Sequence, residues 1–389
     1  MAETIATGAR HTVLRFASPR RRVLPLDRRH HVGHRPVHPI RSLDQVGVPS
    51  AGIGAVGEQG AGHVCALRSD VIVGSDDSNL SRKGRPRSDQ RFRSSTSKGV
   101  TTKMNDLIGS TALITGAGRG QGAAHARELA ARGAAVALFD GPQAVQSVKY
   151  PLATAEQTEE VAAQIRRDGG RAIAIAGDVR SRADLDKAVQ AAESEFGPVD
   201  MVVANAGIWG EIASIEDTTE VAWSETLAIN LTGPWNTIQA AIPRMIERNK
   251  GSIVLVSSVL GLDEGMAGGA PYSVTKHGII GLLRNAALEL GPHGITVNAI
   301  CPGFIDTDMH HWQDAYDVMS GQPNGSPDDL IQAARHYAIL KGNKGIQSDE
   351  VSKVVAFLLS GAASILTGVI MPVDAGHSIM NRVNQSPVD

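Results

Sequence analysis

Seven short apolar runs divide the chain between residues 111 and 373. They are 111–115 (TALIT), 135–139 (AVALF), 172–176 (AIAIA), 201–204 (MVVA), 252–256 (SIVLV), 296–300 (TVNAI) and 369–373 (VIMPV). Five of the seven are nearly unbroken by polar residues, which is typical of strands buried on both faces. Between them lie segments with amphipathic helical spacing, for example 121–132, 181–196 and 348–360. This alternation predicts one α/β domain with a doubly wound parallel sheet of about seven strands and right-handed crossovers.

The first 103 residues follow neither a helical nor a strand period. Proline, glycine, serine and arginine dominate stretches such as PRRRVLPLDRRHHVGHRPVHP. This segment holds 18 Lys and Arg against 8 Asp and Glu, whereas residues 104–389 hold 20 against 32. So little apolar surface cannot offset the entropy lost on folding. We therefore interpret residues 1–103 as a disordered basic extension, with the hypothesis that the working protein starts at Met104.

Three other interpretations of this extension compete with disorder. A basic arm could bind nucleic acid, but only Phe16 and Phe92 are available to stack on bases. An Arg-rich, acid-poor opening is also typical of an organelle transit peptide. A histidine cluster could hold a metal, but no regular scaffold orients its members, His30, His31, His34 and His38. Disorder is the preferred interpretation, so we predict neither a metal nor a nucleic-acid partner.

The composition argues against a membrane or secreted protein. No apolar run approaches the roughly 18 residues of a membrane helix, and the opening lacks the apolar core of a secretory signal. Cys65 and Cys301 are far apart and have no partners at metal-ligand spacing. Such sparse cysteine usage favours a reducing, cytoplasmic location.

A glycine-rich loop follows the first predicted strand and opens the first predicted helix. In TGAGRGQG, residues Gly116, Gly120 and Gly122 are spaced four and then two apart. Ligands of doubly wound sheets bind beyond the carboxyl ends of the strands, and glycines there let the backbone approach a pyrophosphate. An ordinary strand-to-helix turn is the alternative. However, Asp140 ends the second strand, where an acid binds the adenosine ribose, so the two features together predict a dinucleotide site.

Asp140 also bears on which dinucleotide binds. A 2′-phosphate about 4 Å from a carboxylate costs several kcal/mol at an effective dielectric near 20, so NAD is favoured over NADP. Arg119 is a contrary sign, because it could meet a 2′-phosphate.

The candidate chemistry lies further along the chain. In YSVTK, Tyr272 and Lys276 are four apart on a predicted helix and therefore share one face. A phenol titrates near 10, so we expect the cationic neighbour to lower the pKa of Tyr272 toward neutral pH. Ser258 follows the fifth strand, where its hydroxyl could bind a substrate carbonyl or alcohol.

These residues resemble the short-chain dehydrogenase/reductase family over almost all of residues 104–389. TGAGRGQG is similar to the family's T-G-x-x-x-G-x-G, NAG (205–207) to its motif after the fourth strand, and CPGFIDT (301–307) to its nicotinamide end. The resemblance implies a Rossmann-type domain that moves a hydride between nicotinamide C4 and an alcohol or ketone carbon. It also implies a homodimer or homotetramer in which HGIIGLLRNAALEL (277–290) and 223–249 pair with a second copy.

The resemblance also implies the site residues. The catalytic residues are Asn230, Ser258, Tyr272 and Lys276. The cofactor-binding residues are Gly116, Arg119, Gly120, Gln121, Gly122, Asp140, Asp178, Val179, Asn205, Ala206, Gly207, Tyr272, Lys276, Pro302, Gly303, Ile305 and Thr307, and no metal is implied.

The family's pattern assigns a role to several of these residues. Tyr272 would transfer the proton, and Lys276 would lower its pKa and bind ribose. Asn230 would hold a relay water, Asp178 would contact adenine, and Thr307 would bind the carboxamide. The interval from Ser258 to Tyr272 is one residue longer than is common, so we place the extra residue in the loop GLDEGMAGGAP. Ser257 stays as the alternative to Ser258.

A narrower resemblance rests on an insertion after the second strand. The stretch DGPQAVQSVKYPLATAEQTEE, which contains YPLAT, is similar to the carveol-dehydrogenase-like branch, whose members are associated with mycofactocin. The resemblance implies NAD held so tightly that a redox mediator reoxidises it in place. We expect residues 141–160 to cover the adenosine, and we do not expect this loop to reach the reacting carbon. An inconsequential surface loop is the alternative.

The sequence thus predicts an NAD-dependent oxidoreductase acting on a small apolar, terpenoid-like secondary alcohol. The alternatives are an NADP-dependent 3-oxoacyl carrier reductase and a catalytically idle nucleotide sensor. We expect the substrate pocket to come from Trp209, the loop 261–270 and a lid over 308–345. The apolar side chains expected to line it are Trp209, Met266, Met309 and Trp312.

Overall fold

The computed structural model describes residues 106–141, 144–262 and 265–380. The extension predicted over residues 1–103, with its histidine cluster, lies outside the described residues.

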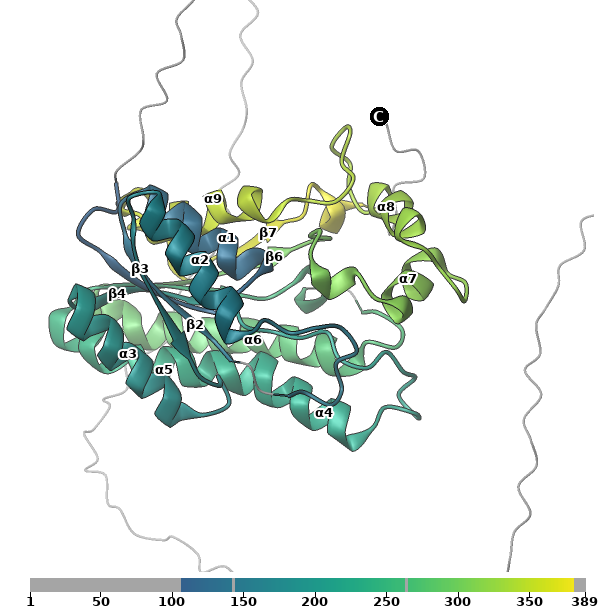
Figure 1. Ribbon diagram of the computed structural model, residues 1–389, viewed down its shortest axis with the longest axis horizontal. Helices are drawn as coiled ribbons and strands as arrows, with labels where there is room; N and C mark the ends of the chain where they lie inside the picture. Colours follow the sequence, from purple (N-terminus) through teal and green to yellow (C-terminus); the bar gives the residue numbers. More distant parts are fainter. Residues whose placement is uncertain (1–105, 142–143, 263–264, 381–389) are drawn as a thin grey trace, which may run out of the picture. The chain divides into compact units, whose positions relative to one another are not determined.

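A seven-stranded parallel sheet forms the centre of the described domain (Figure 1). The strand order is β3-β2-β1-β4-β5-β6-β7, which is a doubly wound arrangement with the two halves meeting at β1 and β4. The strands are β1 (Thr111–Thr115), β2 (Ala135–Asp140), β3 (Arg171–Ala176), β4 (Val199–Ala204), β5 (Gly251–Val256), β6 (Ile295–Pro302) and β7 (Ile370–Val373). All seven predicted strands and the predicted fold class are therefore confirmed.

Helices cover both faces of the sheet. The helices are α1 (Gly120–Ala131), α2 (Ala155–Arg167), α3 (Arg182–Phe196), α4 (Glu220–Leu227), α5 (Gly233–Arg248), α6 (Ala270–Leu290), α7 (Gln313–Ser320), α8 (Pro327–Arg335) and α9 (Ser348–Leu359). In Figure 1, α1, α2 and α9 lie on one face, α3, α5 and α6 lie on the other, and α7 and α8 stand to the side. The predicted helices 121–132, 181–196 and 348–360 are confirmed as α1, α3 and α9.

Local sequence explains where several helices begin. Thr154 caps α2 in a reciprocal capping box with Gln157, and Ser181 and Thr219 accept backbone N–H bonds at the starts of α3 and α4. Each side chain satisfies an N–H group that the first turn of a helix leaves without a partner. These caps fix the residues at which α2, α3 and α4 begin.

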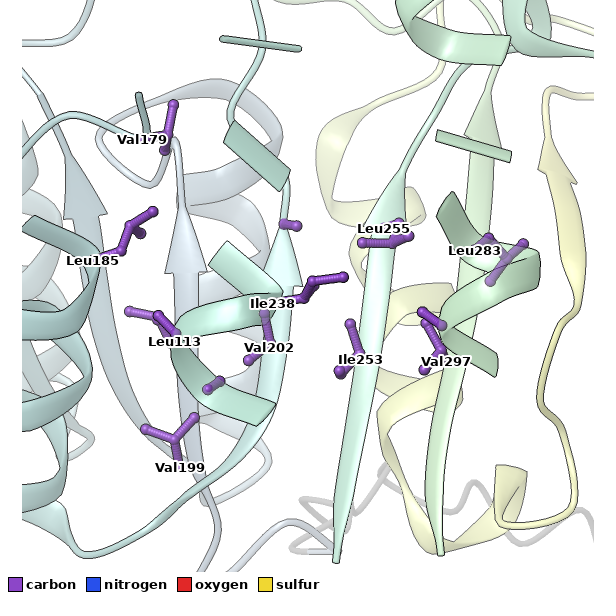
Figure 2. Close-up of a cluster of buried hydrophobic side chains, with 14 of the residues drawn as sticks. Leu113, Val179, Leu185, Val199, Val202, Ile238, Ile253, Leu255, Leu283 and Val297 are labelled. Carbon is purple, nitrogen blue, oxygen red and sulfur yellow. The ribbon is translucent and has the colours of Figure 1, made fainter. Parts of the chain in front are cut away.

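The continuous apolar runs are explained by burial on both faces of the sheet. On one face, Leu113, Val202, Ile253 and Val297 come from four neighbouring strands and pack beneath α3, α5 and α6 (Figure 2). On the other face, a second cluster joins the strands to α1, α2 and α9. A strand between two helical layers has no solvated face, so it needs apolar residues at consecutive positions.

The stretch 223–249, which the family resemblance implies to pair with a second copy, is not one continuous α-helix. α4 ends at Leu227, a π-helical turn spans Ala228–Thr232, and α5 begins at Gly233. Such turns insert one extra residue per turn and are frequent at functional sites. Here the turn carries Asn230.

Among the helices of the described ranges, none combines the length and apolar content needed to cross a membrane. The predicted cytoplasmic location stays a prediction.

Candidate active site

One cavity of about 890 Å³ lies where the strands end at their carboxyl edge. Its volume is in the range of small-molecule and cofactor sites. The structure brings these sequence-predicted residues together around it: Gly116, Arg119, Gly120, Gln121, Gly122, Asp140, Asp178, Val179, Asn205, Ala206, Gly207, Ser258, Tyr272, Lys276, Pro302, Gly303, Ile305 and Thr307. Asn230 is buried behind this wall.

The glycine loop between β1 and α1 has a shape that only glycine permits at two positions. Gly116 adopts a positive φ of 67°, and a Cβ on Gly122 would lie 2.0 Å from the Gly116 carbonyl oxygen. Asn205 braces the loop from β4, because its Nδ2 donates to the carbonyls of Thr115 at 3.0 Å and Gly116 at 3.2 Å. The loop is thus a rigid backbone cradle at a helix N-terminus, suited to an anionic group.

Asp140 faces the same cavity from the end of β2. Its two carboxylate oxygens accept backbone N–H bonds from Gly118 at 2.8 Å and from Gly141 at 2.9 Å. Burial raises the pKa of this carboxyl, and the two N–H bonds oppose the rise. The side chain is therefore held in one orientation by the glycine loop itself.

Arg119 is already engaged by two partners of the protein. Its guanidinium pairs with Asp308 at 3.3 Å and lies 5.5 Å from the centroid of the Tyr150 ring. These contacts weaken the argument that Arg119 is present to receive a 2′-phosphate. They also link the glycine loop to two other segments, 144–154 and 308–310.

The residues present fit a dinucleotide. The cradle has no space for a side chain at Gly116 or Gly122, and Asp140 offers a fixed carboxylate for a ribose diol. Asp178 and Val179 line the same cavity. The Gln121 Oε1 atom, at the start of α1, is buried without a hydrogen-bond partner among the described residues. Such an orphaned acceptor is costly unless a ligand satisfies it.

The other end of the cavity holds the candidate chemistry. Tyr272 and Lys276 project from α6, and Ser258 follows β5. Burial raises the pKa of Tyr272 to about 12, and a hydrogen bond with Ser258 works in the opposite direction. A phenol bonded to a serine hydroxyl beside a buried amine can hold or move a proton.

The net shift of the Tyr272 pKa is upward, opposite to the direction expected from its pairing with Lys276. The lysine Nζ donates to the Val256 carbonyl at 3.0 Å and lies 5.4 Å from the centroid of the tyrosine ring. Burial lowers the pKa of the lysine itself to about 8. Because both groups lose their hydration, desolvation outweighs the attraction that the four-residue spacing suggested.

The two neighbouring serines have different partners. The Ser257 hydroxyl donates to the Lys276 backbone carbonyl at 2.8 Å, which makes it a tie between β5 and α6. The Ser258 hydroxyl instead accepts the Leu260 N–H at 3.2 Å and lies beside the phenol of Tyr272, whose pKa it lowers. The geometry favours Ser258 over Ser257 as the substrate-binding serine.

Asn230 acts on the backbone next to the cavity. Its Oδ1 accepts the N–H of Ile208 and its Nδ2 donates to the carbonyl of Ile208, both at 2.8 Å. The amide therefore holds the strand extension after β4 in place. The relay water predicted for this residue stays a prediction.

The predicted substrate wall is confirmed in part. Trp209, Met266 and Met309 line the cavity. Trp312 is buried behind them and packs edge-on against Trp209, with ring centroids 6.1 Å apart. Trp312 therefore supports the wall and does not form it.

Phe304 and His310 are among the wall residues that the sequence analysis did not name. Phe304 and His310 line the cavity, and their rings lie 4.7 Å apart. Burial lowers the pKa of His310 to about 4, so its ring is neutral at physiological pH. No spacing signal marks either residue, because their place in the wall depends on how this segment packs against Trp209, whose ring centroid is 5.4 Å from that of His310.

The insertion after β2 contributes both to the cavity wall and to the packing behind it. Val145, Leu152 and Ala153 line the cavity, while Tyr150 is buried in a cluster with Trp209 and Trp312. Tyr272 itself packs against this cluster. The insertion therefore contributes aromatic packing beside Tyr272, and the expectation that it does not reach the reacting carbon stays a prediction.

In the three described ranges, no group of three His, Cys, Asp or Glu side chains is placed to hold a metal ion.

Several known proteins are similar to this chain in sequence and in fold. The model of the short chain dehydrogenase family matches residues 110–316. The (-)-trans-carveol dehydrogenase of Rhodococcus erythropolis is 39% identical over 277 residues, which are 71% of this chain and 100% of that protein. The cis-4-hydroxycyclohexanecarboxylate dehydrogenase of Sinomonas cyclohexanicum is 35% identical over 269 residues, which are 69% of this chain and 96% of that protein. The crystal structure of carveol dehydrogenase from Mycobacterium avium in complex with NAD is similar, with a TM-score of 0.68, 34% identity and coverage of 71% of this chain and 99% of that one.

Proposed function

The chain belongs to the short-chain dehydrogenase family, and from that premise we propose that it transfers a hydride between NAD and a secondary alcohol or ketone. The observation that carries the proposal is a single cavity with the glycine cradle and Asp140 at one end and Ser258, Tyr272 and Lys276 at the other. NAD is supported by the fixed Asp140 carboxylate and by the similar carveol dehydrogenase, whose structure is a complex with NAD.

The chain's own residues handle the proton. When bound, NAD supplies the acceptor or donor of the hydride. Tyr272, protonated at neutral pH with a pKa of about 12, donates its proton to the ketone oxygen during reduction and receives it during oxidation. Ser258 orients the same oxygen and the phenol, and the buried Lys276 amine holds the backbone of β5 beside them. Because oxidation needs the phenol to give up its proton, raising the pH favours that direction.

The substrate class follows from the wall around the proton donor. Trp209, Met266, Phe304 and Met309 present aromatic and thioether surface to the cavity. Such a wall favours an apolar ring over a charged chain, since a buried charge without a partner is costly. Two similar proteins are dehydrogenases of ring-bearing alcohols, namely (-)-trans-carveol and cis-4-hydroxycyclohexanecarboxylate. A small alicyclic, terpenoid-like secondary alcohol is therefore our proposed substrate.

The cofactor is proposed to stay bound between turnovers. The insertion after β2 leaves Asp140 and lines the cavity through Val145, Leu152 and Ala153. Its backbone is anchored at Gln146 and Ser147, whose N–H groups donate to the Glu225 carboxylate at 3.1 and 2.8 Å. Release then requires this anchored segment to open, and a mycofactocin-type redox mediator would reoxidise NAD in place.

Assembly is proposed to use α4, α5 and α6. Trp223, Trp235, Val274 and Leu288 are exposed apolar side chains on these helices. Exposed apolar side chains of this size favour association with a second copy, giving a homodimer or a homotetramer.

The test uses the purified protein and Tyr272→Phe side by side. Bound NAD is measured after extensive dialysis, and oxidation of a panel of secondary alcohols is then assayed with free NAD and with an artificial electron acceptor. We expect the protein to retain NAD and to turn over faster with the acceptor than with free NAD. Tyr272→Phe is expected to retain NAD and to lose at least about 100-fold in turnover, the size of a lost general acid.

Three results would contradict parts of the proposal. An unmodified protein that oxidises no alcohol would reject the dehydrogenase assignment in favour of a nucleotide sensor, whereas measurable turnover that is equal in Tyr272→Phe would reject only Tyr272 as the proton donor. Protein that is purified without NAD and works well with free NAD would reject only the retained cofactor.

A further inference from the structure

The insertion after β2 is tied to the lid as well as to the cofactor side. We call residues 144–154 the strap. From here on, 'the lid' means residues 308–320, the first part of the segment predicted over 308–345. The Lys149 Nζ of the strap lies 2.6 Å from Asp314 of the lid, and the Tyr150 ring packs on Trp312 with centroids 5.8 Å apart. The strap is therefore placed between the adenosine end and the substrate end of the cavity.

Tyr150 is the one aromatic side chain of the strap. It is 5% exposed, and its Oη accepts the backbone N–H of Trp209 at 2.9 Å, across 59 residues of sequence. Burial raises the pKa of this phenol to about 12, so the oxygen stays neutral over the working range of pH. The Arg119 guanidinium covers the same ring from the glycine loop. One side chain thus touches the cofactor loop, the lid and the substrate wall.

Trp209 is the part of the substrate wall that depends on this bond. It is 6% exposed and lines the cavity directly after Ile208, whose N–H and carbonyl are both held by Asn230. Asn230 fixes the first half of this short segment, and Tyr150 fixes the second. Without the phenol oxygen, the N–H of Trp209 would be buried with no partner, and the segment would move to satisfy it.

We propose that Tyr150 is a positioning residue for the substrate, which acts by fixing the backbone of Trp209 and hence the aromatic wall that receives the alcohol's ring. The proposal rests on the dehydrogenase function proposed above. It assigns the strap a second task beyond cofactor retention, which is to shape the substrate site. Ring-bearing alcohols reach this wall, whereas an alcohol as small as 2-propanol contacts Tyr272 and Ser258 without filling the space to Trp209.

The test is Tyr150→Phe in the full chain, assayed with an artificial electron acceptor on cyclohexanol and on 2-propanol. This change removes one oxygen and keeps the ring between Arg119 and Trp312. We expect the KM for cyclohexanol to rise about tenfold, the loss that follows from one unsatisfied buried N–H, with kcat within about twofold. The KM for 2-propanol is expected to stay within about twofold. A general structural defect would instead move both alcohols together.

The matched control is Tyr316→Phe. Tyr316 lies on α7 of the same lid, and its Oη is 3.4 Å from Nδ1 of His311, away from the cavity wall. We expect this variant to leave both KM values unchanged. Lys149→Gln is the second test variant, because its side chain is 57% exposed and its loss does not threaten the fold. Releasing the strap from Asp314 is expected to raise the ratio of the two KM values in the same direction, by about twofold.

The outcomes separate this inference from the function on which it rests. Selective loss of cyclohexanol affinity in Tyr150→Phe supports it, and so does the smaller selective loss in Lys149→Gln if Tyr150→Phe does not fold. An unchanged ratio of KM values in the folded variants overturns it while the dehydrogenase assignment stands. A wild-type protein that oxidises no alcohol overturns both.

Discussion

Replacing Lys276 by methionine is expected to stabilise the protein near neutral pH while removing its activity. The lysine is 4% exposed, and burial lowers its pKa from 10.5 to about 8. Among the described residues, its side-chain amine makes one hydrogen bond, from Nζ to the Val256 carbonyl at 3.0 Å. Methionine has a similar length and an adaptable apolar end, so it can fill the same space without the buried charge.

The magnitude follows from the pKa of Lys276. The fall from 10.5 to about 8 corresponds to a destabilisation of about 3 kcal/mol by the charged form, at about 1.4 kcal/mol per unit. Loss of the hydrogen bond to Val256 destabilises the variant by about 1 kcal/mol, so the net increase in its free energy of unfolding is about 2 kcal/mol. The sign depends on pH. Below pH 8 the amine is charged in both the folded and the unfolded protein, so burial of the charge destabilises the folded protein by the full amount. Between pH 8 and 10.5 the unfolded chain binds the extra proton, so the stability of the wild type rises with pH and the advantage of methionine disappears.

The assay is urea unfolding of the wild type and Lys276→Met at pH 7 and at pH 10.5, at one protein concentration because assembly shifts apparent stability. Lys353→Met on α9 is the matched control, since Lys353 is exposed. We expect the control to show no such pH-dependent difference. Turnover of Lys276→Met, measured in parallel, is expected to fall by at least about tenfold.

Two results would refute this reasoning. One is a variant less stable than the wild type at pH 7, which would mean that the amine contributes more through its contacts than it costs by burial. The other is a difference in the free energy of unfolding that is equal at pH 7 and pH 10.5, which would mean that titration of Lys276 plays no part.

Two further predictions concern the cofactor and the start of the chain. Asp140→Ser is expected to raise the ratio of NADP to NAD affinity by about 1000-fold, because it removes a carboxylate whose repulsion of a 2′-phosphate is about 4 kcal/mol at 4 Å and an effective dielectric near 20, at tenfold per 1.4 kcal/mol. Tighter binding of NADP than NAD by the unmodified protein would contradict it. A chain that begins at Met104 is expected to fold and turn over as well as the full chain, because the composition and charge change there; loss of activity or of cooperative unfolding on truncation would show that the extension belongs to the enzyme.

The proposed chemistry shows where local reasoning about charge fails. The spacing of Tyr272 and Lys276 correctly placed both on one face of α6, but it did not give the direction of the lysine amine or the hydration of either group. The direction of the amine depends on β5, because the Val256 carbonyl accepts its hydrogen bond. The hydration of both groups depends on the side chains that bury them. Spacing along a helix therefore predicted a pair, and the surrounding packing set its pKa values.

The sequence by itself determined the sheet, its cover of helices and the cofactor cradle. These features are local, because an apolar run buried on both faces, a capping residue or a glycine at Gly116 with a positive φ restricts the chain where it stands. The carboxyl ends of parallel strands then meet at one edge, which is why most of the predicted site residues line one cavity.

Only the tertiary structure decided how the distant segments meet. The bond from Trp209 to Tyr150 spans 59 residues, and the pair between Arg119 and Asp308 spans 189. No period or spacing encodes such contacts, because each depends on how the strap and the lid pack over the finished sheet. The reach of the insertion was therefore decided by the burial of its one aromatic ring against Trp209 and Trp312, a gain that exists only after the rest of the domain has folded.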